Sequence, residues 1–258
     1  MQRVITRTGI ELDVAEVRRI PVTAPLRWLA AGWHDLWRVP IDSIGYGLLF
    51  VALAYGITAL AWQAPWIVVT LVTGFLLIAP AFAVVFYALS RELEQGRHVS
   101  LRVALGLWRD KALCTALYAG VLAMVLVFWV MASLVLTALS VYGTQASVVA
   151  SLPALFTTSD GWAFLALYLG SGAVFALAVY LGAAVSLPMM LDRGTDPVTA
   201  VATSARAVVR NPRAMALWAI LIAAITALGL ASAYIGLALA LPLISHATWH
   251  AYRDLVAD

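Results

Sequence analysis

Charged residues are scarce in this chain of 258 residues. Only 11% of the residues are Asp, Glu, Lys or Arg, whereas 64% are apolar. Soluble domains carry about 25% charged and about 45–50% apolar residues, so a soluble fold of this size cannot bury so much apolar surface. The composition therefore predicts an integral membrane protein, with the lipid bilayer as the solvent for much of the chain.

Cysteine is almost absent as well, since Cys114 is the only one. A single cysteine excludes an intrachain disulfide and a cysteine-rich metal site. The formal charge of +3 comes mostly from arginines that flank apolar runs, as expected near anionic lipid headgroups, so we predict no nucleic-acid partner. We expect no secretory signal peptide, because residues 1–42 carry six arginines and five acidic residues before the first long apolar run.

Six apolar runs are long enough to cross about 30 Å of hydrocarbon. They cover residues 43–62, 64–90, 113–140, 161–190, 214–230 and 232–250. The first five contain no Asp, Glu, Lys, Arg or His, and such residues inside a membrane usually mark proton or ion paths. We therefore expect no pump, proton-coupled carrier or voltage sensor. We interpret 214–250 as two spans that turn near residues 229–234, and one very long helix is the alternative.

The positive charges are distributed asymmetrically between the loops. All sixteen Lys and Arg residues fall on one side of the six-span arrangement, and the opposite loops carry only one acidic residue, Asp160. Because Lys and Arg concentrate in cytoplasmic loops, we predict that both termini are cytoplasmic. Residues 1–22 then form a cytoplasmic N-terminal tail, and residues 23–258 form a single membrane domain.

An internal repeat divides the membrane domain into copies at about 23–94, 95–195 and 196–258. In the first and third copies, fifteen positions separate two prolines (Pro25 and Pro40, Pro197 and Pro212), and an Arg stands two residues before the second proline. The middle copy, 96–111, keeps the spacing without the prolines. The predicted fold class is all-α: a polytopic membrane helix bundle of about six transmembrane helices, built from three parallel repeats of amphipathic helix plus transmembrane hairpin.

The amphipathic segments are expected to lie in the membrane interface, because each has an apolar face and basic polar residues. The apolar face of the first contains Leu26, Leu29, Trp33, Leu36 and Trp37, and that of the third contains Val198, Val201, Ala205 and Val208. Asp196 is positioned to cap the third helix. These helices either close off the end of the bundle as static structural elements or act as a mobile gate or a platform for a partner. We favour the static structural role.

The second helix of each hairpin carries a proline, namely Pro80, Pro188 and Pro242. Proline frees a carbonyl one turn earlier and can kink a helix. Three such kinks either frame a cavity or bend the hairpins around one axis, and we favour the second.

Two groups of polar residues are candidate sites. His246 and His250 lie four residues apart on one helical face, a spacing that can bind a metal or cofactor. The sequence fixes no third ligand, so we predict no metal and no cofactor, and histidines that anchor a helix end instead. The other group is a cytoplasmic polar cluster of His34, Asp35, Arg91, Glu92, Arg210, Arg253 and Asp254. The alternative to this cluster is a set of snorkelling arginines with solvated acids.

Four segments carry a family resemblance: Gly-Trp-His-Asp-Leu at 32–36, Ser-Ile-Gly-Tyr-Gly at 43–47, residues 87–96 around Leu-Ser-Arg-Glu-Leu-Glu, and His-Ala-Thr-Trp-His-Ala-Tyr-Arg at 246–253. Together, over about residues 20–255, they resemble a bacterial, mainly proteobacterial, family of uncharacterised integral membrane proteins catalogued as a domain of unknown function. The resemblance implies a multi-pass protein of the bacterial inner membrane and supplies no reaction. Some members are labelled as similar to cytochrome oxidase subunits, which makes a respiratory complex one candidate partner.

These features favour a protein that is not an enzyme, since the sequence contains no P-loop, nucleophile elbow or Rossmann glycine pattern. The leading hypothesis is an accessory, assembly or scaffolding subunit of a larger inner-membrane complex, with other subunits or a second copy of the chain as partners. The alternative is a permease or channel for a small neutral solute, lined by Tyr55, Thr58, Thr70, Thr73, Tyr87 and Tyr168. A membrane enzyme that uses the region of His246 and His250 is a distant third.

Overall fold

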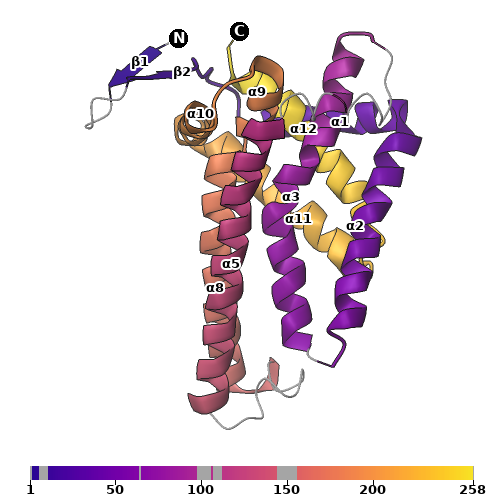
Figure 1. The fold of residues 1–258 in the computed structure, drawn as a ribbon, viewed down its shortest axis with the longest axis vertical. Coiled ribbons are helices and arrows are strands. Elements are labelled where there is room, and N and C mark those ends of the chain that lie inside the picture. The colour runs from indigo at the N-terminus through magenta and orange to yellow at the C-terminus, as the bar shows by residue number, and fades with distance from the viewer. Residues whose placement is uncertain are drawn as a thin grey trace. The chain divides into compact units, whose positions relative to one another are not determined.

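A computed structural model describes residues 2–5, 11–63, 65–97, 106, 112–143 and 156–257 (Figure 1). Its helices are α1 (Ala24–Arg38), α2 (Pro40–Leu60), α3 (Pro65–Glu94), α5 (Ala112–Gly143), α8 (Ser159–Ala183), α9 (Ser186–Arg193), α10 (Pro197–Arg210), α11 (Pro212–Ala231) and α12 (Leu237–Leu255). The N-terminal tail adds a hairpin that the sequence analysis did not anticipate. In it, β1 (Gln2–Ile5) pairs antiparallel with β2 (Glu11–Val14), with Gln2 opposite Val14.

Long apolar helices dominate the fold. Among the described residues, five helical segments are long and apolar enough to cross a membrane: Pro40–Leu60, Trp66–Glu94, Thr115–Ser140, Ser159–Arg193 and Pro212–Ala231. A helix satisfies its backbone hydrogen bonds internally, which is what a lipid environment demands of a spanning segment. The predicted polytopic membrane helix bundle is confirmed.

The sixth predicted span, 232–250, differs from the other five. Its helix, α12, is not among the five segments that qualify by length and apolarity. The reason is its C-terminal half, which carries His246, His250, Arg253 and Asp254. Most of the residues of α12 are buried within the chain, so this helix is a packed core element with few side chains left to face lipid.

The stretch 214–250 forms two helices, as predicted, and the alternative of one long helix is wrong. The turn between α11 and α12 includes Ala233 (φ 52°) and Tyr234 (φ 70°), both in the left-handed region that side chains disfavour. Tyr55 holds this turn, because its hydroxyl donates to the Ala233 carbonyl oxygen at 2.7 Å and its ring packs edge-on against that of Tyr234. Contacts from α2 therefore support the unusual backbone.

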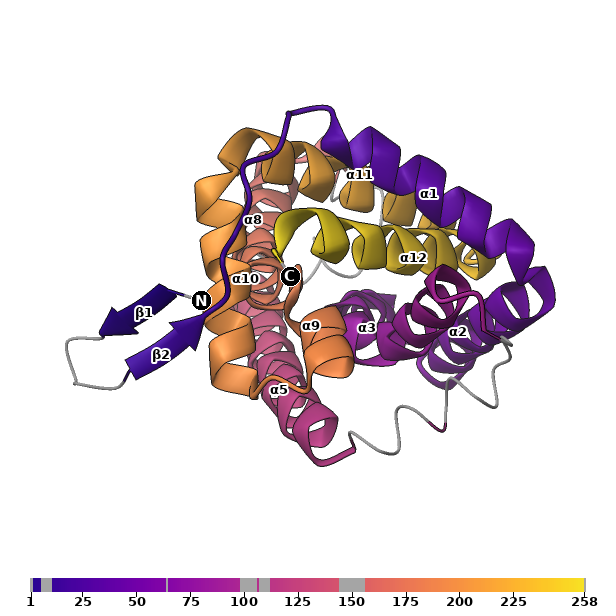
Figure 2. The same cartoon turned by 90° about the horizontal axis from the view of Figure 1, so that it is seen from above.

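The chain divides into two compact units. The first unit comprises residues 1–55, 80–119 and 180–258, and the second comprises 56–79 and 120–179. In the first unit, α12 lies in the middle, with α1 and α11 along one side and α9 and the end of α3 on the other (Figure 2). Two glycines allow this packing, since a Cβ at Gly32 or Gly47 would collide with the α12 backbone at Ala247 or Ala238.

The segment before α1 meets the C-terminal end of α12 in the first unit. Val17 and Val256 form an antiparallel bridge, and the Arg18 amide donates to the Leu255 carbonyl oxygen at 2.8 Å. The Ala257 amide donates to the Glu16 carbonyl oxygen at 2.9 Å. The segment before α1 and the end of α12 therefore lie side by side.

The second unit packs around Trp129, which is 2% exposed. Its indole N–H donates to the Thr70 carbonyl oxygen at 3.1 Å and to Thr73 Oγ1 at 3.2 Å. The Tyr168 and Phe175 rings pack edge-on against the indole, and the Tyr168 hydroxyl lies 3.0 Å from Thr70 Oγ1. A buried indole needs a partner for its N–H, and here the backbone of α3 supplies one.

The amphipathic helix α1 turns its large apolar side chains outward. Leu26, Trp33 and Trp37 are each about half exposed, while Asp35 and Leu36 are buried. In a soluble protein this arrangement would be unfavourable, but it suits a helix whose outer face lies in the membrane interface.

The amphipathic helix α10 likewise exposes apolar side chains and buries polar ones. Val198 and Val209 are 63% and 73% exposed, whereas Thr203 and Ser204 are fully buried. The buried hydroxyls have partners: Thr203 donates to the carbonyl one turn earlier at 2.8 Å, and Ser204 accepts from a backbone amide at 3.3 Å. Asp196 caps the helix as predicted, because its side chain accepts from the first-turn amides at 3.0 Å.

Two of the three predicted repeat copies begin alike. Pro25 and Pro197 stand in the first turns of α1 and α10, and Pro40 and Pro212 open the spans that follow. The amphipathic segment of the middle copy, 96–111, lies largely outside the described residues. The threefold repeat therefore remains a prediction.

The three prolines of the hairpins occupy different settings. Pro80 lies inside α3 and Pro242 inside α12, as predicted for the second helices of hairpins. Pro188 instead lies in the first turn of α9, and the helix breaks between Ala183 and Ser186. A proline ring clashes with the carbonyl four residues earlier, here that of Ala184, which explains why the break comes at this point.

Candidate functional site

Five polar side chains from four helices meet inside the first unit, and we name them the inner cluster. Asp35 comes from α1, Ser43 from α2, Ser90 from α3, and His246 and His250 from α12. Ser43 Oγ lies 3.0 Å from His246 Nε2, and Ser90 Oγ lies 2.8 Å from His246 Nδ1. Asp35 Oδ2 accepts from Ser90 at 2.7 Å and pairs with His250 Nε2 at 2.8 Å. The first four of these residues are at most 5% exposed.

The donor and acceptor of each hydrogen bond between Ser43, His246, Ser90 and Asp35 can be assigned in one consistent way. Because the single proton of Ser90 goes to the Asp35 carboxylate, Ser90 Oγ accepts from His246 Nδ1. A neutral His246 that donates from Nδ1 must accept at Nε2, and there the Ser43 hydroxyl is the donor. The chain of bonds runs from Ser43 through His246 and Ser90 to Asp35.

The carboxylate of Asp35 is the end point of this chain. Burial raises the pKa of Asp35, but the hydrogen bonds from His250 and Ser90 lower it by more, so the net pKa lies below the ordinary value of 3.8. Asp35 is therefore ionised at neutral pH and holds α1 against α3 and α12 through charged hydrogen bonds, which are the stronger kind.

An outer network surrounds the last turns of α12, and its first centre is Asp192. Arg91 Nε donates to Asp192 Oδ1 at 3.0 Å, and the Tyr252 hydroxyl donates to Asp192 Oδ2 at 2.8 Å. Arg193 Nε donates to the Tyr252 hydroxyl oxygen at 2.8 Å. This centre joins α3, α9 and α12.

Glu94 and Asp254 are the other two centres of the outer network. Glu94 accepts from the Trp249 indole at 2.9 Å and from Arg253 Nε at 3.1 Å. Asp254 accepts from the Trp28 indole at 2.9 Å and from an exposed arginine of α1 at 3.1 Å. Because α12 contributes a polar residue to each centre, its C-terminal half is tied to α1, α3 and α9.

The structure brings together only part of the predicted cytoplasmic polar cluster. Four of its members lie in the inner cluster or the outer network: Asp35, Arg91, Arg253 and Asp254. Glu92 instead pairs with Arg97 at 2.6 Å, and His34 is exposed on α1. Arg210 lines a separate surface pocket.

His246 and His250 do not converge on a common point. The His246 ring is bound on both nitrogens by serines, and His250 Nε2 is directed at Asp35. Among the described residues, no group of three or more His, Cys, Asp or Glu is placed to hold a metal ion. The histidines instead connect helices.

The residues predicted to line a solute path are divided between the two units. Thr70, Thr73 and Tyr168 pack with Trp129 in the second unit. In the first unit, Tyr87 is 3% exposed, and Tyr55 holds the turn between α11 and α12. Thr58 is half-buried near the end of α2.

Several members of the two groups were not singled out as site residues from the sequence: Ser43, Ser90, Glu94, Asp192, Trp249 and Tyr252. Serines and aromatics in apolar runs are common, and nothing in their spacing marks a partner more than 150 residues away, as for Ser90 and His246. One signal was available, however. The four segments that carry the family resemblance, 32–36, 43–47, 87–96 and 246–253, together contain every member of the inner cluster.

Comparison with known proteins agrees with the membrane character of the chain. Residues 67–192 match the model of a family described as "Predicted integral membrane protein (DUF2189)", whose function is unknown. The resemblance to an uncharacterised membrane family is thus confirmed, over a shorter stretch than the expected 20–255, and of the inner cluster only Ser90 lies in the matched region. No curated protein and no solved structure matches the chain.

Proposed function

We propose that this integral membrane protein is a non-catalytic subunit that scaffolds or helps to assemble a larger complex of the bacterial inner membrane. The observation that carries the proposal is the pairing of the inner cluster. Asp35, Ser43, Ser90 and the two histidines use their polar atoms on one another. In a catalytic site, such groups would converge on a space for substrate. Here they fasten helices together, as a scaffold requires.

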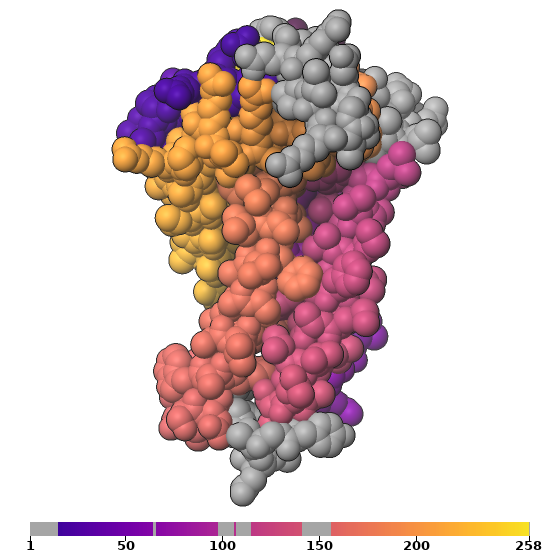
Figure 3. Space-filling view, turned by 90° about the vertical axis from the view of Figure 1, so that its left-hand side faces the viewer, coloured from indigo at the N-terminus to yellow at the C-terminus, as the bar shows by residue number. Residues whose placement is uncertain are grey.

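The outward faces of the long helices provide surface for partner subunits. Along α5, large apolar side chains point away from the chain, including Val121, Phe128, Met131 and Leu139, each more than half exposed. Figure 3 shows side chains of α5 and α8 along the face turned toward the viewer. In a membrane, lipid or the helices of another subunit cover such surfaces, and we assign part of the α5 face to a partner.

The paired ends of the chain support the predicted orientation. The bridge between Val17 and Val256 puts the segment before α1 beside the end of α12, which supports a chain that starts and ends on one side of the membrane. The basic loops favour the cytoplasm for that side, because Lys and Arg concentrate in cytoplasmic loops. In this arrangement, α1 and α10 lie at the cytoplasmic surface of the inner membrane.

The proposal is tested by extracting the native protein with a mild detergent and weighing the particle by native mass spectrometry. We expect a stoichiometric partner of the inner membrane, with respiratory complexes as the first candidates. A photo-crosslinker at Phe128 on α5 should join that partner, whereas one at Leu48 on the exposed face of α2 serves as the matched control.

A particle that contains only this chain, alone or as a homo-oligomer, would overturn the proposal. Flux assays with neutral solutes on the reconstituted protein would then test the permease alternative.

A further inference from the structure

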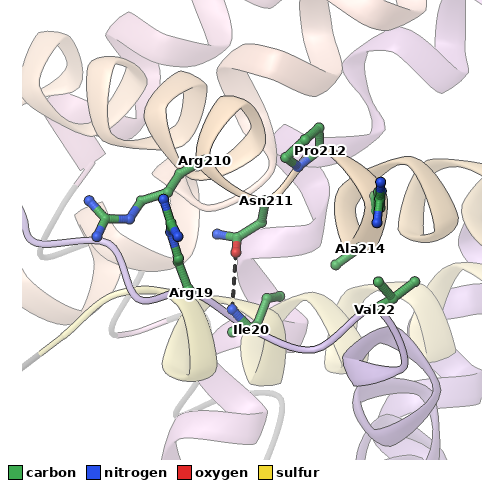
Figure 4. Close-up of a pocket in the computed structure, with 8 residues that line it drawn as sticks. Arg19, Ile20, Val22, Arg210, Asn211, Pro212 and Ala214 are labelled. Carbon is green, nitrogen blue, oxygen red and sulfur yellow. Dashed lines mark hydrogen bonds between the residues drawn. The ribbon is translucent and has the colours of Figure 1, made fainter.

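A surface pocket of about 290 Å³ forms where the N-terminal segment crosses the junction of α10 and α11. Arginines dominate its rim: Arg19 comes from the N-terminal segment, Arg210 ends α10, and Arg213 lies in the first turn of α11. Figure 4 shows Arg19 and Arg210 beside Asn211. All of these residues belong to the first unit.

The charged residues that line this pocket are all positive. None of its lining residues is acidic, and the three arginines make no ion pair with the part of the chain that the structure describes. All three side chains belong to exposed residues. Three guanidinium groups around one hollow repel one another and attract an anion, and arginine donors match the oxygens of a phosphate group.

Asn211 builds the pocket from the inside and is 6% exposed. Its Oδ1 accepts from the Ile20 amide at 3.0 Å, and its Nδ2 donates to the Arg18 carbonyl oxygen at 3.0 Å. These two bonds fix the backbone on both sides of Arg19. Because the Asn211 side chain is used in this way, it makes no capping hydrogen bond to α11. The positive end of the α11 dipole is left uncapped beside the three arginines.

The location of the pocket identifies the source of the anion. It lies at the start of Pro212–Ala231, a segment long and apolar enough to cross a membrane, so it is at the level of the lipid headgroups. Exposed apolar side chains adjoin the arginines: Val22 lines the pocket at 48% exposure, and Val209 precedes Arg210 at 73%. A phosphate with acyl chains attached can contact both the arginines and the apolar side chains, whereas a free phosphate can contact only the arginines.

The geometry points to a binding site for the phosphate group of an anionic phospholipid at Arg19, Arg210 and Arg213. The guanidinium groups hold the phosphate oxygens, and Asn211 positions Arg19. The acyl chains lie along the valines of α10. Such a site anchors the junction of α10 and α11 to the cytoplasmic leaflet, where anionic lipids give basic pockets their affinity.

The chain contains its own control residue. Arg38 stands two residues before Pro40 as Arg210 stands two residues before Pro212, and both arginines are exposed. The residue that follows Arg38 is Val39, which cannot tether a neighbouring segment as Asn211 does. Arg38→Gln therefore removes the same charge from an equivalent helix end that is not part of the pocket.

The test is a titration of the full chain in a neutral detergent with phosphatidylglycerol or phosphatidylcholine, with bound lipids counted by native mass spectrometry. We expect the wild type to prefer phosphatidylglycerol, and Arg210→Gln to weaken its binding about fivefold. Arg19→Gln combined with Arg210→Gln should weaken it about 25-fold. Arg38→Gln should leave it unchanged. Asn211→Ala, which changes no charge, should also reduce the preference, measured on protein whose circular dichroism is that of the wild type.

Three results would overturn the assignment. Equal binding of the two lipids would show that the phosphate charge is not recognised. An equal loss in Arg38→Gln and Arg210→Gln would show a general surface attraction in place of a site. Displacement of phosphatidylglycerol by an equal concentration of inorganic phosphate would show a site for free phosphate. The substituted arginines are exposed, so their variants should fold normally, and an unchanged unfolding temperature verifies this.

Discussion

The Ser90 hydroxyl donates to Asp35 Oδ2 at 2.7 Å, and this bond determines how the neighbouring histidine is protonated. A serine hydroxyl has one proton to give, so Ser90 can only accept from His246, whose Nδ1 lies 2.8 Å away. The bond links α3, which carries Ser90, to the amphipathic helix α1, which carries Asp35. It also fixes which group donates and which accepts at His246.

The first prediction concerns the tautomer of His246. We expect a neutral ring that carries its proton on Nδ1, because Ser90 accepts there and Ser43 donates to Nε2. Nitrogen NMR of the protein with labelled histidine distinguishes the two ring nitrogens directly. His246→Gln identifies the signal by its loss. A signal for a proton on Nε2 would contradict the direction of the whole chain of bonds.

The second prediction concerns the serines of the inner cluster. Ser90→Ala leaves both His246 and Asp35 short of a partner, and each buried group left unpaired costs about 1–3 kcal/mol. Ser43→Ala affects only His246, so its loss of unfolding free energy should be smaller. The measurement is unfolding in mixed detergent micelles.

Ser171→Ala is the matched control for these serines, because among the described residues its hydroxyl bonds only to a carbonyl of its own helix, at 2.9 Å. It should change the free energy of unfolding by less than about 0.5 kcal/mol. Equal effects of the three substitutions would mean that the inner cluster does not join helices.

Much of the architecture followed from local features of the sequence. Apolar run lengths located the spans, the proline spacing located the starts of α1 and α10, and Asp196 marked a helix start that the structure confirms. These features act over a few residues, so they can be recognised without knowing the fold.

The candidate site was harder to predict from the sequence, because its hydrogen bonds join segments that are far apart in the chain. His250 and Asp35 are 215 positions apart, and only the packing of α1 along α12 brings them together. The same packing explains the role of α12, which has the length of a span yet is buried among other helices. Periodicity alone cannot separate a helix that faces lipid from one that faces protein, since both environments are apolar.

The third prediction concerns pH. The pKa of Asp35 is lower in the folded protein than its ordinary value, so the carboxylate stabilises the fold above pH 3.8, and this contribution is lost as the pH falls through the folded pKa. Asp35→Asn should therefore lower the free energy of unfolding at neutral pH, by about 1.5–3 kcal/mol for hydrogen bonds to a charged group.

The difference between wild type and Asp35→Asn should be constant above about pH 5 and should shrink as the pH falls below 3.8 and through the folded pKa, down to about pH 1. Thermal unfolding of both proteins across this range is the measurement. A difference that stays constant over the range would show that Asp35 is not stabilised as a carboxylate.

The last prediction compares two glycines of one helix. A Cβ at Gly47 of α2 would collide with the α12 backbone at Ala238, whereas a Cβ at Gly45 meets no atom within 4 Å. Gly47→Ala must therefore push α2 and α12 apart, and overpacking of this kind costs about 1–3 kcal/mol. Gly45→Ala adds the same methyl group to an exposed helical position, where alanine is favoured over glycine by about 0.5–1 kcal/mol. Unfolding measurements on the two variants should thus give changes of opposite sign. If Gly47→Ala were as stable as Gly45→Ala, the close approach of α2 to α12, and with it the placement of Ser43 beside His246, would be wrong.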